Sequence, residues 1–209
     1  MKEIVELGGV DVLSNQVSFS LVDERPNTNG MTAYCEQTGI RLLCYGSLLG
    51  GFLSDKWLGA SDPSLNPSLL DTASLKKYYR FISHWGGGGR SAWSLFQELL
   101  VACRRIADKH QSAHMVAVDG STSSTAGSAV DNTDNNVTIA DIAMRWTLQQ
   151  PGVGGVIVGA RLGHSMMSHV KENKRVFTFE LDTEDFLMLR QIQSRGRTLP
   201  GDCGDEYRG

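Results

Sequence analysis

Long apolar segments are missing from this chain of 209 residues. No run approaches the roughly 18 consecutive apolar residues that a membrane-spanning helix needs, so we expect no membrane partner. Residues 1–7 are charged and helix-like and do not have the pattern of a secretory signal peptide. From these absences we expect a soluble, cytoplasmic protein.

Cysteine is scarce as well, and its spacing excludes two kinds of site. The chain has four cysteines, at Cys35, Cys44, Cys103 and Cys203. They lie far apart and form no C-x-x-C pair, which argues against a zinc site or a disulfide scaffold and favours a reducing compartment. The histidines add no metal pair, because His164 and His169 are not at the i, i+4 spacing of two ligands on one helix face.

Motifs of nucleophilic and nucleotide-hydrolysing enzymes are absent too. No serine stands in the G-x-S-x-G context of a nucleophile elbow. The glycine run 86–89 lacks the Gly-Lys-Ser/Thr that ends a Walker loop, so it is better interpreted as a flexible connection between two helices. With 20 Lys and Arg against 23 Asp and Glu, the charge is too balanced for a disordered chain or an electrostatic nucleic-acid binder.

Three short segments have the composition of β-strands. Residues 16–22 alternate apolar and polar side chains, residues 40–45 are a second run, and residues 155–158 are continuously apolar. A continuous apolar strand is typical of a parallel sheet that is covered on both faces. Only one weak further candidate, residues 176–181, is present, so a flavodoxin-like sheet of about five strands is disfavoured.

Helical periodicity fills the intervals between these strands. The pattern predicts helices over residues 29–38, 74–85, 92–110, 138–150 and 183–194. Strands that alternate with helices form right-handed βαβ units, so the expected fold is α/β in a single domain. Residues 111–136 are small, polar and aperiodic, and we expect a mobile insertion there.

Ligands of parallel α/β folds bind at the carboxyl ends of the strands, which directs attention to two loops. Tyr45 ends the second strand before a glycine-containing loop, which suits a flat ring stacked on the tyrosine, although simple rim packing is as common. After the third strand, Gly159 lets the backbone approach an anion and Arg161 offers a planar fork to a phosphate. An ordinary strand-to-helix turn with a solvated arginine explains the same residues, and Gln16 fits either a carboxamide or a bond within its own loop.

Four segments follow one another along the chain: NQVSFSL (15–21), IRLLCYGSLLGGFLSDK (40–56), IAMRWTL (142–148) and VIVGAR (156–161). In this order they resemble the aldo-keto reductase family, and the first two resemble its sixth and seventh strands. IAMRWTL (142–148) resembles the helix before the eighth strand, and VIVGAR (156–161) resembles that strand with its adenosine-phosphate loop. The resemblance implies the (β/α)8 TIM barrel, represented here by a partial barrel of about strands 6–8 in one partial domain over residues 1–209.

The family reduces aldehydes and ketones with NADPH, less often NADH, and the resemblance implies roles position by position. Gln16 would hold the nicotinamide carboxamide, and Tyr45 would stack on the ring. The remaining candidate cofactor-binding residues are Gly46, Leu48 and Gly50 along the pyrophosphate, and Gly159, Ala160, Arg161 and Ser165 at the adenosine phosphate. Many members carry a glutamine or arginine near the position of Ser165, and this departure leaves the choice between NADP and NAD open.

The sequence departs from the family in one larger respect. The resemblance begins near the fifth helix of the barrel, and the catalytic Asp, Tyr, Lys and His of the family belong to the part before it. The resemblance therefore implies the cofactor-binding half of an oxidoreductase without catalytic residues, acting on a small carbonyl substrate only if the missing half completes it. The alternative is a non-catalytic dinucleotide-binding or interaction protein that covers its open sheet edges by self-association.

Overall fold

The structure is a computed structural model that describes residues 5, 8–9, 11–119, 136–159 and 172–203. Within these residues the strands form one parallel sheet of three, in the order β1-β2-β3. The strands are β1 (Ser14–Ser18), β2 (Arg41–Tyr45) and β3 (Val153–Val156). β2 lies within its predicted segment, whereas β1 and β3 overlap theirs and each begins two residues earlier.

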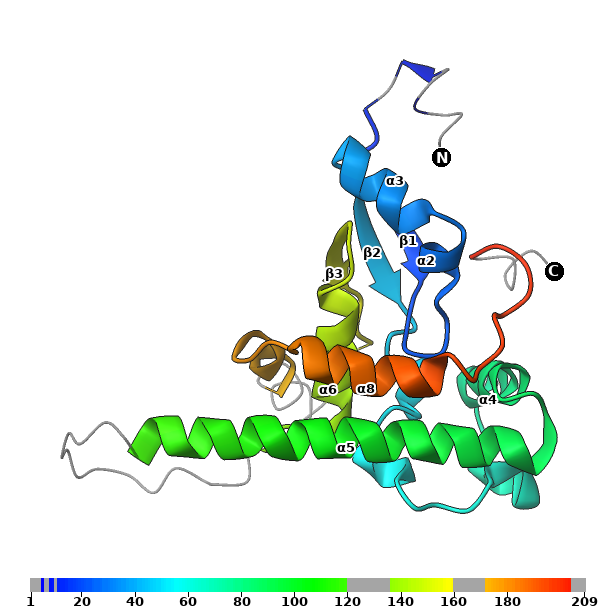
Figure 1. Ribbon diagram of the computed structural model, residues 1–209. Helices are drawn as coiled ribbons and strands as arrows, with labels where there is room; N and C mark the ends of the chain where they lie inside the picture. The colour runs from blue at the N-terminus through cyan, green and yellow to red at the C-terminus, as the bar shows by residue number, and fades with distance from the viewer. Residues whose placement is uncertain (1–4, 6–7, 10, 120–135, 160–171, 204–209) are drawn as a thin grey trace.

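The helices surround one end and one face of this sheet. They are α2 (Arg25–Thr28), α3 (Met31–Thr38), α4 (Ala73–Trp85), α5 (Gly89–Asp119), α6 (Ile139–Leu148) and α8 (Thr183–Gln193). Short 3-10 turns cover Leu49–Gly51, Asp55–Trp57, Pro63–Leu65, Pro67–Leu69 and Arg175–Phe177. In Figure 1 the sheet stands above a layer in which α8 and the long α5 cross the molecule. None of the described helices is both long and apolar enough to cross a membrane.

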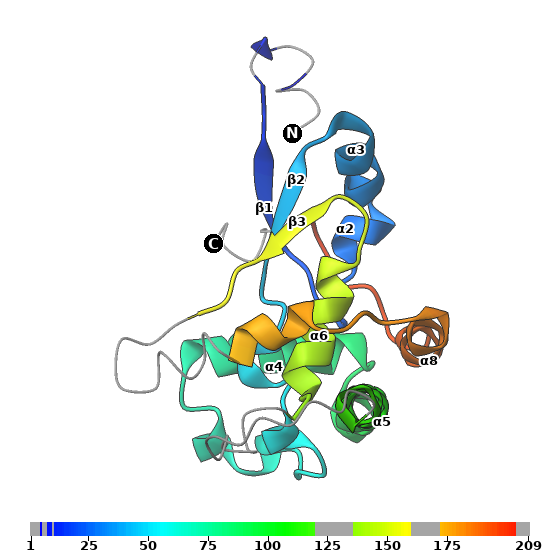
Figure 2. The same cartoon turned by 90° about the vertical axis from the view of Figure 1, so that its left-hand side faces the viewer.

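One face of the sheet is packed and the other is open among the residues that the structure describes. Val17, Leu42 and Cys44 are buried on the packed face, whereas Gln16 on the opposite face is exposed. Figure 2 shows α2 and α3 on one side of the strands. Since side chains alternate along a strand, this pattern is that of a sheet covered on one side within the described residues. The sequence predicts cover on both faces, and that expectation needs correction for this part of the chain.

The first strand ends earlier than the sequence predicts. The prediction extends it to Val22, but the strand stops at Ser18 and the chain turns between Ser20 and Asp23. The two backbones exchange hydrogen bonds of 3.1 and 3.2 Å, and the Ser20 hydroxyl oxygen accepts a further bond from the amide of Asp23 at 3.1 Å. A serine hydroxyl offers the backbone a partner that competes with the sheet, which explains the early turn.

Two further expectations on secondary structure need correction. Residues 111–119 belong to α5, not to a mobile insertion, because no glycine or proline interrupts the chain between the start of that helix and Gly120. The rest of the expected insertion up to residue 135 lies outside the described residues. The weak strand candidate at 176–181 is wrong, since Arg175–Phe177 forms a 3-10 turn there.

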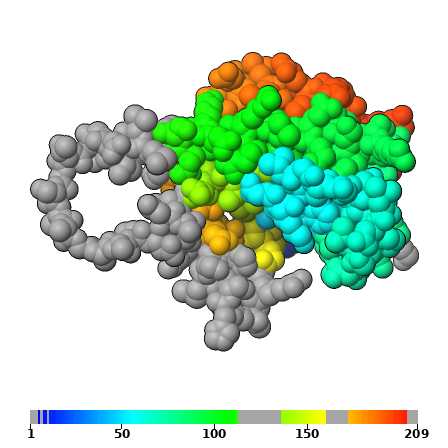
Figure 3. Space-filling model, turned by 90° about the horizontal axis from the view of Figure 1, so that it is seen from below, coloured from blue at the N-terminus to red at the C-terminus, as the bar shows by residue number. Residues whose placement is uncertain are grey.

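An aromatic cluster holds the segment after β2 against α5. The Phe52 ring packs on Trp57 at a centroid distance of 4.7 Å and on Phe96 of α5 at 6.3 Å. Phe52 and Phe96 are fully buried, and burying a side chain of this size stabilises a fold by roughly 2–3 kcal/mol. Figure 3 shows this segment, in cyan, packed along the green α5. The loop that follows the second strand is thereby fixed to the helical layer.

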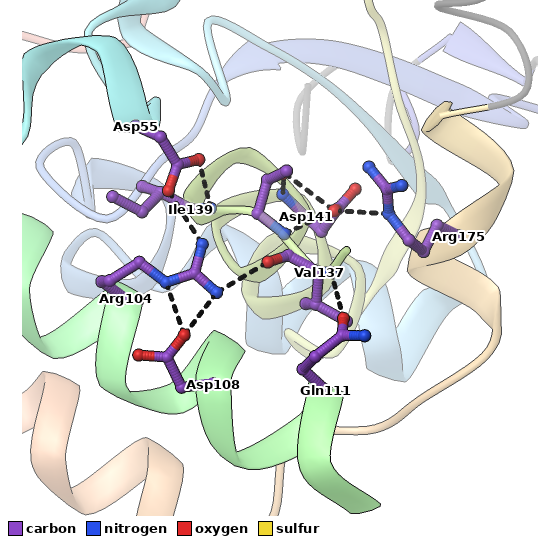
Figure 4. A network of polar contacts seen from close by, with 9 residues as sticks. Asp55, Arg104, Asp108, Gln111, Val137, Ile139, Asp141 and Arg175 are labelled. Carbon is purple, nitrogen blue, oxygen red and sulfur yellow. Dashed lines mark hydrogen bonds and ion pairs between the residues drawn. The ribbon is translucent and has the colours of Figure 1, made fainter. Parts of the chain in front are cut away.

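A polar network joins the segment after β2 to α5 and to the start of α6 (Figure 4). Arg104 of α5 donates to Asp55 Oδ1 at 2.9 Å and to the carbonyl oxygen of Val137 at 2.8 Å. Asp55 also accepts a bond from the amide of Ile139 at 3.1 Å, and Val137 donates its own amide to Gln111 at 2.8 Å. Hydrogen bonds thus join α5, which precedes residues 120–135, to the segment that follows them.

Candidate functional site

A pocket of about 420 Å³ lies where β2 and β3 end, and we call it the glycine-loop pocket. Its walls come from the loop after β2, from α4 and from the residues just after β3. The lining residues are Gly46, Ser47, Leu48, Gly50, Gly51, Ser74, Tyr78, Ile157, Val158 and Gly159. The pairing of the strands continues beyond β3, because the Ile157 amide donates to the carbonyl of Cys44 at 2.7 Å, and this brings the two loops together.

The glycines of the loop after β2 are required by both their backbone and their neighbours. Gly46 and Gly50 have φ angles of +70° and +64°, a left-handed conformation that side chains disfavour. A Cβ at either position would lie 2.7 Å from Tyr78, against its hydroxyl at Gly46 and against its ring at Gly50. The buried Leu49 between them also has a positive φ, of 50°, so the loop holds a strained turn close to Tyr78.

The predicted site residues fall into three groups in the structure. Gly46, Leu48, Gly50 and Gly159 line the pocket together. Tyr45, half-buried at the end of β2, and Gln16, exposed on β1, lie outside the lining. Ala160, Arg161 and Ser165 lie outside the described residues.

Helix α4 contributes residues that the sequence interpretation did not select. Ser74 and Tyr78, one helical turn apart, face the pocket, and Lys77 beside them lies over aromatic rings. The Lys77 ammonium is 5.8 Å from the centroid of the Tyr45 ring and 5.1 Å from that of the Tyr78 ring. Such contacts are attractive cation–π interactions. The helical period of this segment is visible in the sequence, but nothing in it indicates that one face meets the loop after β2.

Among the described residues, the pocket has neither a reactive thiol nor a candidate metal centre beside it. Burial raises the pKa of the Cys44 thiol, behind the loop, to about 12, so this sulfur is protonated at neutral pH. Within the described ranges no group of His, Cys, Asp and Glu side chains is placed to hold a metal ion. The lining itself is uncharged, and its chemistry is that of backbone amides, two serine hydroxyls and a tyrosine. This composition suits binding through the backbone rather than acid–base catalysis.

Comparison with known proteins shows the family of the chain. The model of the aldo/keto reductase family matches residues 1–119 and 124–194. The chain belongs to the aldo-keto reductase family. This is a family of oxidoreductases whose members generally bind NAD(P)H, and the gap in the match falls inside the segment where the sequence predicts an insertion.

Two individual proteins are similar to this aldo-keto reductase chain. A thermostable aldo-keto reductase solved with the inhibitor epalrestat superposes with a TM-score of 0.51 at 17% identity, over 91% of this chain and 43% of that one. Flagellar radial spoke protein 5 of Chlamydomonas reinhardtii is 31% identical over 102 residues, which cover 49% of this chain and 18% of the relative. The first likeness shows a TIM-barrel-like α/β fold, and the chain spans less than half the length of either protein.

Proposed function

We propose that this chain binds a nicotinamide dinucleotide, NADPH or NADH, in the glycine-loop pocket as the cofactor-binding part of an aldo-keto reductase-type enzyme. The observation that carries the proposal is that the loops after β2 and β3 line a single pocket. Gly46, Leu48 and Gly50 would lie along the pyrophosphate, and Gly159 would begin the adenosine-phosphate loop. Ala160, Arg161 and Ser165, which lie outside the described residues, would contact the adenosine phosphate. Gln16 and Tyr45 would contact the nicotinamide.

The pocket fits part of such a ligand on physical grounds. Ligand sites measure about 300–1,000 Å³, so 420 Å³ accommodates a segment of a dinucleotide rather than the whole molecule. Loops without Cβ atoms let backbone amides approach phosphate oxygens closely. Lys77, beside the pocket wall, has a cationic head that can pair with a phosphate.

The catalytic step needs groups that this sequence does not supply. The dinucleotide supplies a hydride, and a carbonyl acceptor also needs a proton donor, which in the family is a tyrosine. We propose that the described strands correspond to strands 6–8 of a barrel, and that the family's Asp, Tyr, Lys and His come from a separate segment. Within this chain, the residues around the glycine-loop pocket bind and orient the cofactor.

Binding is the direct test of this proposal. NADPH and NADH are titrated separately into the purified chain, and the change in their fluorescence is recorded. Replacing the exposed Ser74 with tyrosine places a ring in the pocket, and we expect Ser74→Tyr to weaken binding by about tenfold or more. Arg105→Gln, an exposed change on α5, is the control and should have no effect. If neither dinucleotide binds, or if the two variants behave alike, the proposal is wrong.

A second candidate function is that of a non-catalytic interaction protein. The outer edges of β1 and β3 have no partner strand within the described part of the chain, and unpaired edges are templates for further strands. Leu13, just before β1, and Ile157, just after β3, are 80% and 42% exposed. Self-association through these edges predicts a dimer or larger species by light scattering, and Leu13→Lys and Ile157→Lys should each shift it toward the monomer. A monomer at every concentration would exclude this candidate.

A further inference from the structure

Two adjoining hollows lie on another side of α4 from the glycine-loop pocket. A hollow of about 380 Å³ is lined by Tyr79, Arg80, Ser83, His84, Gly87, Gly88 and Arg197. A neighbouring hollow of about 370 Å³ is lined by Arg25, Arg80, Phe81, His84, Leu199 and Pro200. Because both include Arg80 and His84, we treat them as one surface and call it the Arg80 hollow.

The helical period separates the two sites on α4. Ser74 and Tyr78 are four residues apart and face the glycine-loop pocket. Arg80 and His84, also four residues apart, face the Arg80 hollow, and at 100° per residue their mean direction is about 120° around the helix from that of Ser74 and Tyr78. A ligand in one site therefore meets different side chains from a ligand in the other.

The fold brings two guanidinium groups to this hollow from distant parts of the chain. Arg80 comes from α4, and Arg197 follows α8. The Arg197 amide donates to the carbonyl of Trp85 at 2.7 Å, and Gly196 lies so close to the Trp85 ring that a Cβ there would overlap it. The Arg197 guanidinium reaches to 3.5 Å from the Cβ position of Gly87, in the glycine turn that ends α4. The packing of the segment after α8 against the end of α4 therefore places the Arg197 guanidinium at this hollow.

The charge on this surface is not balanced locally. No carboxylate lines either hollow, and among the residues that the structure describes neither Arg80 nor Arg197 has an acidic side chain within ion-pair distance. Arg25 differs, because it is held by the buried Asp23 at 2.8 Å and by the carbonyl of Asp202 at 2.8 Å. Two planar guanidinium forks at one hollow, with no ion-pair partner among the described residues, are suited to an oxyanion.

The other half of the hollow is apolar. Phe81, Leu199 and Pro200 form its walls, and Arg25 lies over the Phe81 ring at 5.7 Å. An apolar wall next to unpaired cations matches a ligand that is itself half apolar and half anionic.

We propose that the Arg80 hollow binds a small aromatic oxyanion, with its charged group on Arg80 and Arg197 and its ring against Phe81 and Leu199. This site is independent of the dinucleotide proposed for the glycine-loop pocket. The ligand would lie between α4 and the segment after α8.

Calorimetric titration of the full chain with 1-naphthyl phosphate tests the proposal, with 1-naphthol and inorganic phosphate as half-ligands. We expect the naphthyl phosphate to bind about tenfold more tightly than either half-ligand, because it alone uses both walls. Arg80→Gln and Arg197→Gln should each weaken it by about tenfold. Both arginines are exposed, so these variants should fold, and circular dichroism checks that they do.

Two control variants identify the site. Arg105→Gln, which removes an exposed arginine of α5, should leave the affinity for naphthyl phosphate unchanged. Ser74→Tyr, which fills the glycine-loop pocket, should also leave it unchanged. The proposal is overturned if naphthyl phosphate does not bind, if the half-ligands bind equally well, if the Arg80 and Arg197 variants match Arg105→Gln, or if Ser74→Tyr abolishes binding.

Discussion

At the scale of single residues, burial decides which thiols can react. Burial raises the pKa of Cys44 and of Cys103 to about 12, and it raises the pKa of the buried Cys35 as well. Cys203 is only half-buried. Since the thiolate is the reactive form, the three buried thiols are protected both by their protonation and by their inaccessibility.

We therefore predict selective alkylation. Iodoacetamide at pH 8 should modify Cys203 at least about tenfold faster than Cys44 or Cys103, because a thiol with a pKa of 12 is almost entirely protonated at that pH. Peptide mass spectrometry over a time course measures the rates, and all four cysteines should react in denaturant. Equal rates in the native protein would contradict the packing around β2 and α5.

A glycine of the pocket loop permits a second prediction at this scale. Gly46→Ala combines a strained backbone with a contact of 2.7 Å to the Tyr78 hydroxyl, and we expect it to lower the free energy of unfolding by about 2–3 kcal/mol. Gly59 has a similar φ of +73° but no atom within 4 Å of its Cβ position, so Gly59→Ala reports the backbone strain alone, about 1 kcal/mol.

The contact itself is isolated by a double substitution. Tyr78→Phe removes the hydroxyl that an alanine at Gly46 would meet, so the double variant should recover part of the lost stability. Denaturant unfolding measures the unchanged chain, the three single variants and the double variant. If Gly46→Ala costs no more than Gly59→Ala, then Tyr78 does not press on the loop as the structure shows.

At the scale of elements, charged pairs join α5 to the start of α8. Lys109 donates to Asp182 at 2.6 Å and to Asp185 at 2.8 Å, and His110 pairs with Asp185 at 2.7 Å. Asp185 is buried and closes a capping box with Asp182, so the same carboxylates cap α8 and hold α5. Both ends of this junction carry ionisable groups, which makes its strength depend on pH.

The direction of this pH dependence follows from the pKa shifts of Asp182 and Lys109. The hydrogen bond from Lys109 lowers the pKa of Asp182, so its stabilisation is complete above the unfolded value of 3.8 and is lost as pH falls through the folded pKa. Burial alone would lower the pKa of Lys109, but hydrogen bonds to Asp182 and Asp185 raise it overall. Its contribution is complete below 10.5 and is lost only as pH rises through the folded value.

We predict that Lys109→Met makes the acid side of the stability profile shallower. Without the ammonium, the pKa of Asp182 returns toward its ordinary value, and the free energy of unfolding falls less between pH 5 and pH 2. Lys76→Met, an exposed change on α4, is the control and should keep the original slope. Urea unfolding at several pH values gives the comparison, and identical slopes for the two variants would contradict the junction.

At the scale of the whole molecule, the proposed function predicts binding without turnover. Under the proposed function, the chain carries the cofactor pocket, and the resemblance to the family predicts that the catalytic Asp, Tyr, Lys and His belong to a separate segment. We expect the purified chain to show no aldehyde-dependent oxidation of NADPH above the uncatalysed rate, monitored by absorbance. Aldehyde-dependent oxidation by this chain alone would contradict the assignment of its strands to one part of a barrel.

The sequence by itself determined the approximate positions of the three strands and of helices α3, α4, α5, α6 and α8, the parallel pairing of the strands, and which family the chain resembles. Hydrophobic period, capping residues such as Thr138 and Asp182, and motif order are local properties, so they can be read along the chain. The sequence does not predict the end of the first strand at Ser18, because there the Ser20 side chain competes with the sheet for the backbone. It also does not predict that residues 111–119 are helical.

Only the tertiary structure decided which residues of different elements meet. Tyr78 against Gly46, Lys77 over Tyr45, and Arg197 beside Gly87 are contacts between segments whose sequences contain no reference to one another. Such contacts depend on how helices pack on the sheet, which is set by the fit of whole surfaces rather than by any local pattern. For this chain the sequence therefore determined the family and the elements, and packing determined the pocket walls and the second surface on α4.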